Sequence, residues 1–146
     1  RIITIIGMDV NTLIKALNDE DNSELLNLTH KKIESMKREI LNELEVDTDM
    51  VDEFMNKLEE YRYVDGIDEL KYGAYLRWIP IIDPDNIKLN TGGILCDLKV
   101  VDSVTKVVCK SFRQKHYQFN LDECLIFLKM SNQEKVLISA LDHLSK

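Results

Sequence analysis

The three cysteines and one of the three histidines have side chains that together could bind zinc or form a nucleophile pair. They are Cys96, Cys109, His116 and Cys124, separated by 13, 7 and 8 residues. Structural zinc sites usually take their ligands in close pairs on turns, whereas these residues lie along apolar strand patterns. No third residue at a recognisable spacing would orient His116 toward a thiolate. The pattern therefore predicts reduced core cysteines, with no metal, no cofactor and no catalytic residue.

A basic stretch follows the middle of the chain, with no Asp or Glu between Asp102 and Asp122. Its charged residues are Lys106, Lys110, Arg113, Lys115 and His116. Together with Arg77 and the aromatic residues Tyr75, Trp78 and Tyr117, they could hold single-stranded nucleic acid by phosphate attraction and base stacking. The alternative is that the aromatic residues are core and the lysines are merely exposed. The chain's net charge of −7 favours this alternative, because it opposes polyanion binding.

The remaining motifs do not indicate catalysis. Most carboxylates lie on expected helix surfaces, where a solvated face is the usual role of Asp and Glu. Gly92-Gly93 leads into a strand pattern and not into a helix N-terminus, so a tight turn explains the pair without a phosphate ligand. The sequence thus predicts a protein that is not an enzyme.

Charge divides the chain into two regions of opposite sign. Residues 1–70 carry 8 Lys+Arg and 18 Asp+Glu, whereas residues 71–146 carry 11 and 8. We expect an acidic helical region over residues 1–66 and a small β-barrel with a C-terminal helix over residues 67–146. The link between them falls at Val64–Asp68, and the length of 146 residues predicts that both pack as one unit.

Three helices are expected in the acidic region. The first spans Asp9–Asn18, and the second runs from Ser23 to about Leu44, with an apolar stripe at Leu26, Ile33, Met36, Ile40 and Leu44. The third begins at Asp47 or Thr48 and runs to about Tyr63, with Val51, Phe54, Leu58 and Tyr61 on one side. The short link between the second and third helices predicts an antiparallel helical hairpin.

Five strands are expected in the second region, at Tyr72–Ile82, Ile94–Val101, Val104–Phe112, Tyr117–Phe119 and Cys124–Met130. Turns are expected at Pro84-Asp85-Asn86 and Asp102-Ser103, and Gly92-Gly93 should take positive φ or allow close backbone approach. Alternation places Ile94, Cys96, Leu98 and Val100 inward. A capping box at Ser131–Glu134 starts a last helix that should cover the sheet. The fold class is α+β, with a curled antiparallel sheet or small barrel.

A common core should bury the largest apolar side chains of this region. We expect its members to be Trp78, Ile94, Leu98, Phe119, Ile126 and Leu137. No apolar run approaches the length of a membrane helix, and residues 1–7 are too short for a signal-peptide core, which predicts an intracellular, reducing location without membrane insertion. We expect residues 1–7 to be an extension or a cut end that pairs with a sheet edge or a partner.

One segment resembles a known group of proteins. The pattern Leu70-Lys71-Tyr72-Gly73-Ala74-Tyr75-Leu76-Arg77-Trp78-Ile79, then Leu89 and Gly92-Gly93-Ile94-Leu95, is similar to a pattern in small uncharacterised proteins of large double-stranded DNA viruses. The resemblance covers residues 70–130. It implies a compact SH3-like β-barrel that is associated with the virion, and it implies no active site.

Three functions are compatible with these observations. The first is a non-enzymatic interaction or structural protein, a minor virion component whose partners are other virion proteins or itself, located in the virion or host cytoplasm. The second is a nucleic-acid-binding module that uses the hairpin Lys106–His116 and Arg77. The third is a small enzyme.

Overall fold

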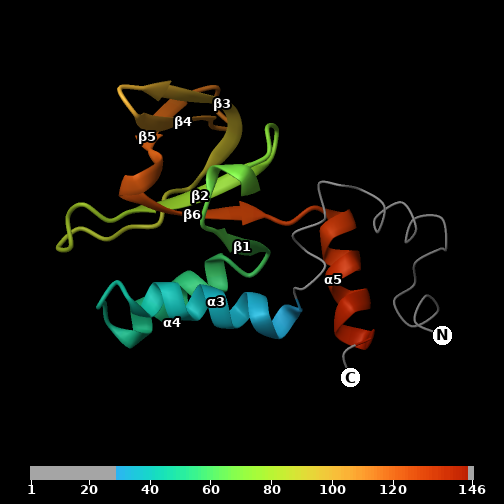
Figure 1. Ribbon diagram of the computed structural model, residues 1–146. Helices are drawn as coiled ribbons and strands as arrows, with labels where there is room; N and C mark the ends of the chain where they lie inside the picture. Colours follow the sequence, from blue (N-terminus) through green and yellow to red (C-terminus); the bar gives the residue numbers. More distant parts are fainter. Residues whose placement is uncertain (1–28, 145–146) are drawn as a thin grey trace. The chain divides into compact units, whose positions relative to one another are not determined.

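The computed structural model describes residues 29–144, and within them the fold is α+β with an antiparallel sheet (Figure 1). The helices are α3 (His30–Asn42), α4 (Thr48–Lys57) and α5 (Asn132–Leu144). The strands are β1 (Tyr61–Val64), β2 (Tyr75–Pro80), β3 (Gly93–Val101), β4 (Val104–Lys110), β5 (His116–Asn120) and β6 (Cys124–Lys129), with 3-10 turns at Ile67–Glu69 and Leu121–Glu123. The helix expected at Asp9–Asn18, the start of the next one and residues 1–7 lie outside the described residues.

Residues 29–144 group into two compact units. One consists of Lys37–Lys129 and contains the whole sheet with α4 and the end of α3. The other consists of residues 29–36 and 130–144, which hold the start of α3 and all of α5.

The sheet has six strands in the order β1-β6-β2-β3-β4-β5, one more than the sequence predicts. All five expected strands are present. The additional strand, β1, corrects the prediction that the third helix continues to Tyr63, because α4 ends at Lys57 and Leu58 is its C-cap. Residues 61–64 are aromatic, β-branched or long, which favours a strand, and they pair with β6 from Tyr61↔Lys129 to Val64↔Ile126.

A β-bulge in β3 reverses the expected side-chain alternation. The register of β3 with β4 shifts between Leu95 and Asp97, so Leu95 lies opposite Cys109 and Leu98 lies opposite Val107. Leu95 and Leu98 therefore face the core, with one extra residue between them. The predictions that Ile94, Cys96 and Val100 are inward core positions are wrong. Ile94 is 47% exposed and Cys96 is exposed, and Val100, near the β3–β4 turn, is 69% exposed.

The two faces of the sheet bury different cores in the Lys37–Lys129 unit. On one face, Val51, Phe54 and Leu58 of α4 pack with Ile79 and Phe127 of the sheet. On the other face, β3, β4 and β5 arch over β2 and β6 (Figure 1) and enclose a second cluster. Trp78 lies at its centre, with its ring stacked on Phe119 at a centroid distance of 4.5 Å.

The expected core is correct in part. Trp78 and Ile126 are buried together, and Leu98 and Phe119 pack against them. Ile94 is excluded by the bulge. Leu137 is buried, but in a separate cluster with Ile33, Met130 and Ile138. These last residues all belong to the smaller unit, where the apolar side of α5 packs on the first turns of α3.

A buried lysine changes the expected face of α3. The predicted stripe includes Met36, which is 44% exposed, whereas Lys37 is 0% exposed. The ammonium group of Lys37 donates a hydrogen bond of 2.8 Å to the carbonyl oxygen of Leu58 at the end of α4. A cation at a helix C-terminus satisfies carbonyl groups that have no partner within the helix, so the charge can be buried there.

Three further local predictions are confirmed, for the Asp102-Ser103 turn, the glycine pair and the capping box. Asp102 and Ser103 both have positive φ, as a two-residue β3–β4 hairpin turn requires. Gly92 has φ +100°, and a side chain on Gly93 would collide with the backbone of Lys110. At the start of α5, the backbone N–H of Glu134 donates to the hydroxyl of Ser131 at 3.1 Å, and the N–H of Ser131 donates to the Glu134 carboxylate at 3.3 Å. This reciprocal pair is a capping box.

Candidate functional site

The turn between β4 and β5 presents a phenylalanine to solvent. Phe112 is 93% exposed, the most exposed large apolar side chain among the described residues. It occupies a β-turn in which the N–H of Gln114 donates to the carbonyl of Ser111 at 2.9 Å. Ser111 and Lys115 close the turn, with a backbone hydrogen bond of 2.8 Å between them. Backbone hydrogen bonds therefore hold the turn that presents the exposed Phe112 side chain.

Cations surround this turn on both strands. Lys110 is directly opposite His116 at the last pair of the hairpin, and Arg113 and Lys115 lie in the turn itself. The ammonium group of Lys115 is 5.6 Å from the centre of the Tyr117 ring, within the range of a cation–π contact. We call Lys110, Phe112, Arg113, Lys115 and His116 the hairpin tip. The structure thus brings four of the six sequence-predicted contact residues together.

The outer face of β3, β4 and β5 extends this positive surface. Cross-strand pairing defines three rows on this face. The outer two contain Lys99, Lys106 and Asn120, and Ile94, Lys110 and His116, and the row between them contains Asp97, Val108 and Gln118. Residues in one row share a face, so Lys106 lies on the same side of the sheet as Lys110. Lys99 was not among the predicted contact residues, although the predicted two-residue turn at Asp102-Ser103 places it opposite Lys106.

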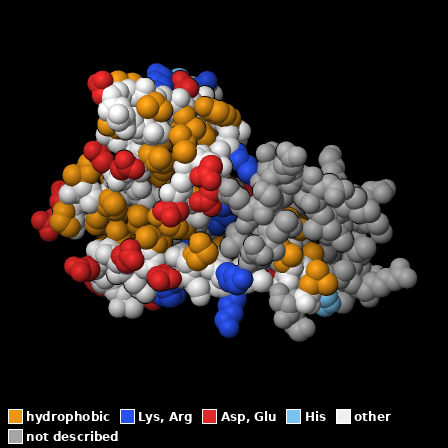
Figure 2. Space-filling model, viewed as in Figure 1, with side chains coloured by type: hydrophobic (Ala, Val, Ile, Leu, Met, Phe, Trp, Pro, Cys, Tyr) orange, Lys and Arg blue, Asp and Glu red, His pale blue; other side chains and the backbone are white. Residues whose placement is uncertain are grey.

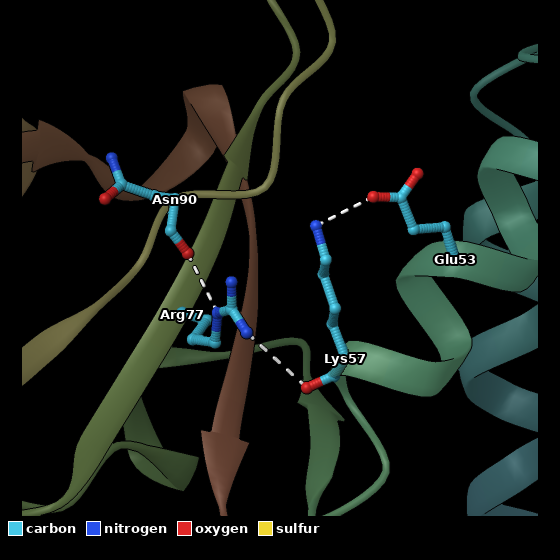
Figure 3. Close-up of polar contacts among 4 residues, drawn as sticks. All are labelled: Glu53, Lys57, Arg77 and Asn90. Atoms are coloured by element: carbon cyan, nitrogen blue, oxygen red, sulfur yellow. Dashed lines mark hydrogen bonds and ion pairs between the residues drawn. The ribbon is translucent and has the colours of Figure 1, made fainter.

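Arg77 lies elsewhere and has a structural role (Figure 3). Its Nε donates to the carbonyl of Asn90 at 2.9 Å, and its Nη1 lies 3.5 Å from the carbonyl of Lys57 at the end of α4. Lys57 in turn contacts the carboxylate of Glu53 at 2.8 Å. The guanidinium group therefore links β2, the β2–β3 loop and α4, and it is only partly exposed.

The aromatic residues that the sequence offered for base stacking are not on this surface. Trp78 is 2% exposed and lies inside the arch of the sheet. Tyr117 packs against the same cluster, and Tyr75 packs on the opposite face, near α4. Phe112, which was not named as a contact residue, is the exposed aromatic side chain at the tip. The sequence could have indicated Phe112 as a contact residue, because it is an aromatic residue within the polar segment Ser111-Phe112-Arg113-Gln114.

The four residues considered for zinc or thiol chemistry are divided between the two faces of the sheet. Cys109 and Cys124 pack in the cluster around Trp78, whereas His116 and Cys96 are exposed on the outside. Burial raises the pKa of Cys109 to about 12 and that of Cys124 to about 11, which disfavours the thiolate in both. Among residues 29–144, no group of three or more His, Cys, Asp or Glu could hold a metal ion.

A groove of about 320 Å³ lies at the other end of the sheet, in the same unit. Its apolar lining comes from α3, the β2–β3 loop and β6, through Ile40, Leu44, Ile81, Pro84, Ile87 and Leu125. Glu43 and Glu45 complete the lining, and both are exposed. Figure 2 shows hydrophobic side chains gathered over the β2–β3 loop, with acidic side chains below them over the α3–α4 connection. The sequence did not predict this groove, because three distant segments form it.

Comparison with protein-family models, curated proteins and solved structures finds no match to this chain. Within the part of the chain that the structure describes, no helix is long and apolar enough to cross a membrane.

Proposed function

We propose that this chain is a non-enzymatic contact protein that binds a partner through the hairpin tip. The observation that carries the proposal is the exposure of Phe112 in a hydrogen-bonded turn between cations. Burying a phenylalanine side chain contributes about 1.5–3 kcal/mol, a gain that the chain alone does not obtain here. A partner that covers Phe112 would obtain it.

A pair of like charges on the outer face of β3 and β4 supports an acidic partner. Lys99 is directly opposite Lys106. Like charges in such positions destabilise a sheet, so this pair does not serve the fold. An acidic surface on a partner would relieve the repulsion and would also steer the two molecules together.

The proposal includes a structural role in a virus particle, which rests on the resemblance of residues 70–130. It also includes two finer features of the fold. The first is a helical hairpin of α3 and α4, supported by the ion pair of Arg38 with Asp52 at 3.1 Å and by the bond from Lys37 to Leu58. The second is an SH3-like barrel, supported by short antiparallel strands curled around Trp78.

The test is to identify what co-purifies with the full chain from its native source, in parallel for the wild type and for the double variant Phe112→Ser, Arg113→Ser. We expect protein partners whose recovery falls at least tenfold in the variant. Val100→Ser is the matched control, because Val100 is an exposed apolar residue near the other end of the β3–β4 hairpin. Recovery that is equal for all three chains would contradict the proposal.

A nucleic-acid-binding module is the second candidate, favoured by the row of cations on β3 and β4. Its test is binding of a mixed-sequence single strand at about 0.15 M salt, where screening extends over only about 8 Å. If it is correct, replacing Lys110, Arg113 and Lys115 by alanine weakens binding to all sequences alike and flattens the salt dependence. We expect no salt-sensitive binding by the wild type, because the net charge of −7 opposes attraction to a polyanion.

A further inference from the structure

The groove and the hairpin tip are complementary in charge. Residues 39–53, which contain Glu43 and Glu45 of the groove, include seven Asp or Glu and no Lys or Arg. Of these seven, Asp52 and Glu53 pair with Arg38 and Lys57. Residues 103–121, which contain the tip, include four Lys or Arg and no Asp or Glu. Within residues 29–144, the carboxylates of Glu43 and Glu45 form no ion pair with a Lys, Arg or His side chain. The two carboxylates are therefore available to cations from outside.

The groove and the tip are also complementary in shape and polarity. A cavity of roughly 150 Å³ is sufficient for a benzene molecule in a protein interior. The groove has about 320 Å³ and six apolar residues in its lining, so it can receive an aromatic ring together with part of a neighbouring side chain. Phe112 is the exposed aromatic side chain at the tip, and Arg113 follows it directly.

A chain cannot place its own tip in its own groove. The tip adjoins the start of β2, since Lys110 is opposite Ile94 and Ile94 is opposite Tyr75. The groove adjoins the end of β2, where Ile81 follows Pro80. A strand of this length separates the two sites by roughly 17–20 Å, which is more than a phenylalanine side chain can span.

We propose that Phe112 of one chain inserts into the groove of a second copy of this chain, with Arg113 and Lys115 facing Glu43 and Glu45. This inference rests on the proposed function, because it names the partner of the hairpin tip. Each chain then has a free tip at one end and a free groove at the other. Such head-to-tail contacts build rings if the rotation closes and filaments if it does not. A self-assembling chain of this kind would suit a structural protein.

The experiment is sedimentation velocity of the full chain over a range of concentrations. We expect the wild type to form species larger than a dimer as concentration rises. Phe112→Ser should abolish binding by the tip, because it removes the aromatic side chain. The double variant Glu43→Lys, Glu45→Lys should abolish binding by the groove, because it reverses the charge there. Each variant alone should therefore be monomeric. An equal mixture of the two variants should give a dimer that does not grow, because one intact tip meets one intact groove.

Two control chains separate this contact from general effects. Val100→Ser removes an exposed apolar side chain, and Glu59→Lys with Asp68→Lys makes the same change in net charge at exposed positions away from the groove. Both should assemble as the wild type does. Circular dichroism of every variant should match that of the wild type, and the mixing result itself requires both variant chains to be folded.

Three outcomes would overturn the inference. The first is a wild type that stays monomeric at every concentration, and the second is assembly that persists without Phe112. In the third, assembly is lost with Phe112 but kept with both glutamates reversed, which would place the tip elsewhere on the second copy. The first outcome leaves the proposed function standing if a different protein still co-purifies in a Phe112-dependent way. A nucleic acid bound at the tip of a monomeric chain would overturn both.

Discussion

Replacing Leu95 and Ile94 separately by alanine tests the bulge in β3, which decides which residues of the arch form its core. The two residues are neighbours in one strand, yet Leu95 is 1% exposed and Ile94 is 47% exposed. Truncating a buried leucine removes its transfer free energy and leaves a cavity, at a cost of about 2–5 kcal/mol. Truncating a half-exposed residue on a strand surface should cost less than about 1 kcal/mol.

Thermal and denaturant unfolding of the full chain can measure this difference. For a chain of this size, each kcal/mol changes the melting temperature by about 2–4 °C, so Leu95→Ala should lower it by roughly 4–20 °C. Trp78 is the only tryptophan in the sequence and is buried in the same cluster, so its fluorescence reports on this part of the fold. If Ile94→Ala is as costly as Leu95→Ala, or costs more, the bulge is misplaced.

Three further predictions follow from local geometry. Gly92→Ala should lower the free energy of unfolding, measured by urea unfolding, by more than about 2 kcal/mol. The reason is that Gly92 has φ +100° and that a side chain there would collide with a β2 carbonyl. A loss below about 0.5 kcal/mol would be inconsistent with this backbone conformation at Gly92. Ser131→Ala removes one half of the capping box and should cost about 1 kcal/mol, whereas an unchanged melting temperature would argue against the cap. Burial raises the pKa of Cys109 from 9.0 to about 12 and that of Tyr63 from 10.0 to about 12, so the fold favours their neutral forms. The contribution of these two groups to the free energy of unfolding should therefore be fully present below pH 9 and should be lost as pH rises from about 9 toward 12. A free energy of unfolding that is constant from pH 9 to 12 would contradict the burial of Cys109 and Tyr63.

Local sequence signals predicted much of the fold. The strands β2 to β6 have clear apolar patterns bounded by turns, and the start of α5 has a complete capping box. Two features depend on tertiary context and were missed. Residues 61–64 continue the apolar spacing of α4, and only the pairing partner β6 makes them a strand. The predicted apolar stripe of α3 did not include Lys37 because this residue is charged, and the carbonyl group that permits its burial belongs to the end of a different helix.

The candidate site was predictable only where it is continuous in sequence. The charged residues of the hairpin tip lie within the seven residues from Lys110 to His116, so the sequence alone brings them together. The role of Phe112 could have been inferred from its place in a polar turn. Arg77 was grouped with the tip by charge, although its contacts with Asn90 and Lys57 depend on how the β2–β3 loop folds back. The groove combines α3, the loop and β6, so no single segment indicates it.

Zero-length cross-linking between isotopically distinct copies of the wild-type chain tests the central claim most directly. Equal amounts of ¹⁴N-labelled and ¹⁵N-labelled chain are mixed, and a carbodiimide joins lysine to carboxylate only where the two are in contact. We expect cross-linked peptides of mixed isotope that join Lys115 or Lys110 of one chain to Glu43 or Glu45 of the other. Assembly without such mixed cross-links, or mixed cross-links that join the tip to other carboxylates, would contradict it.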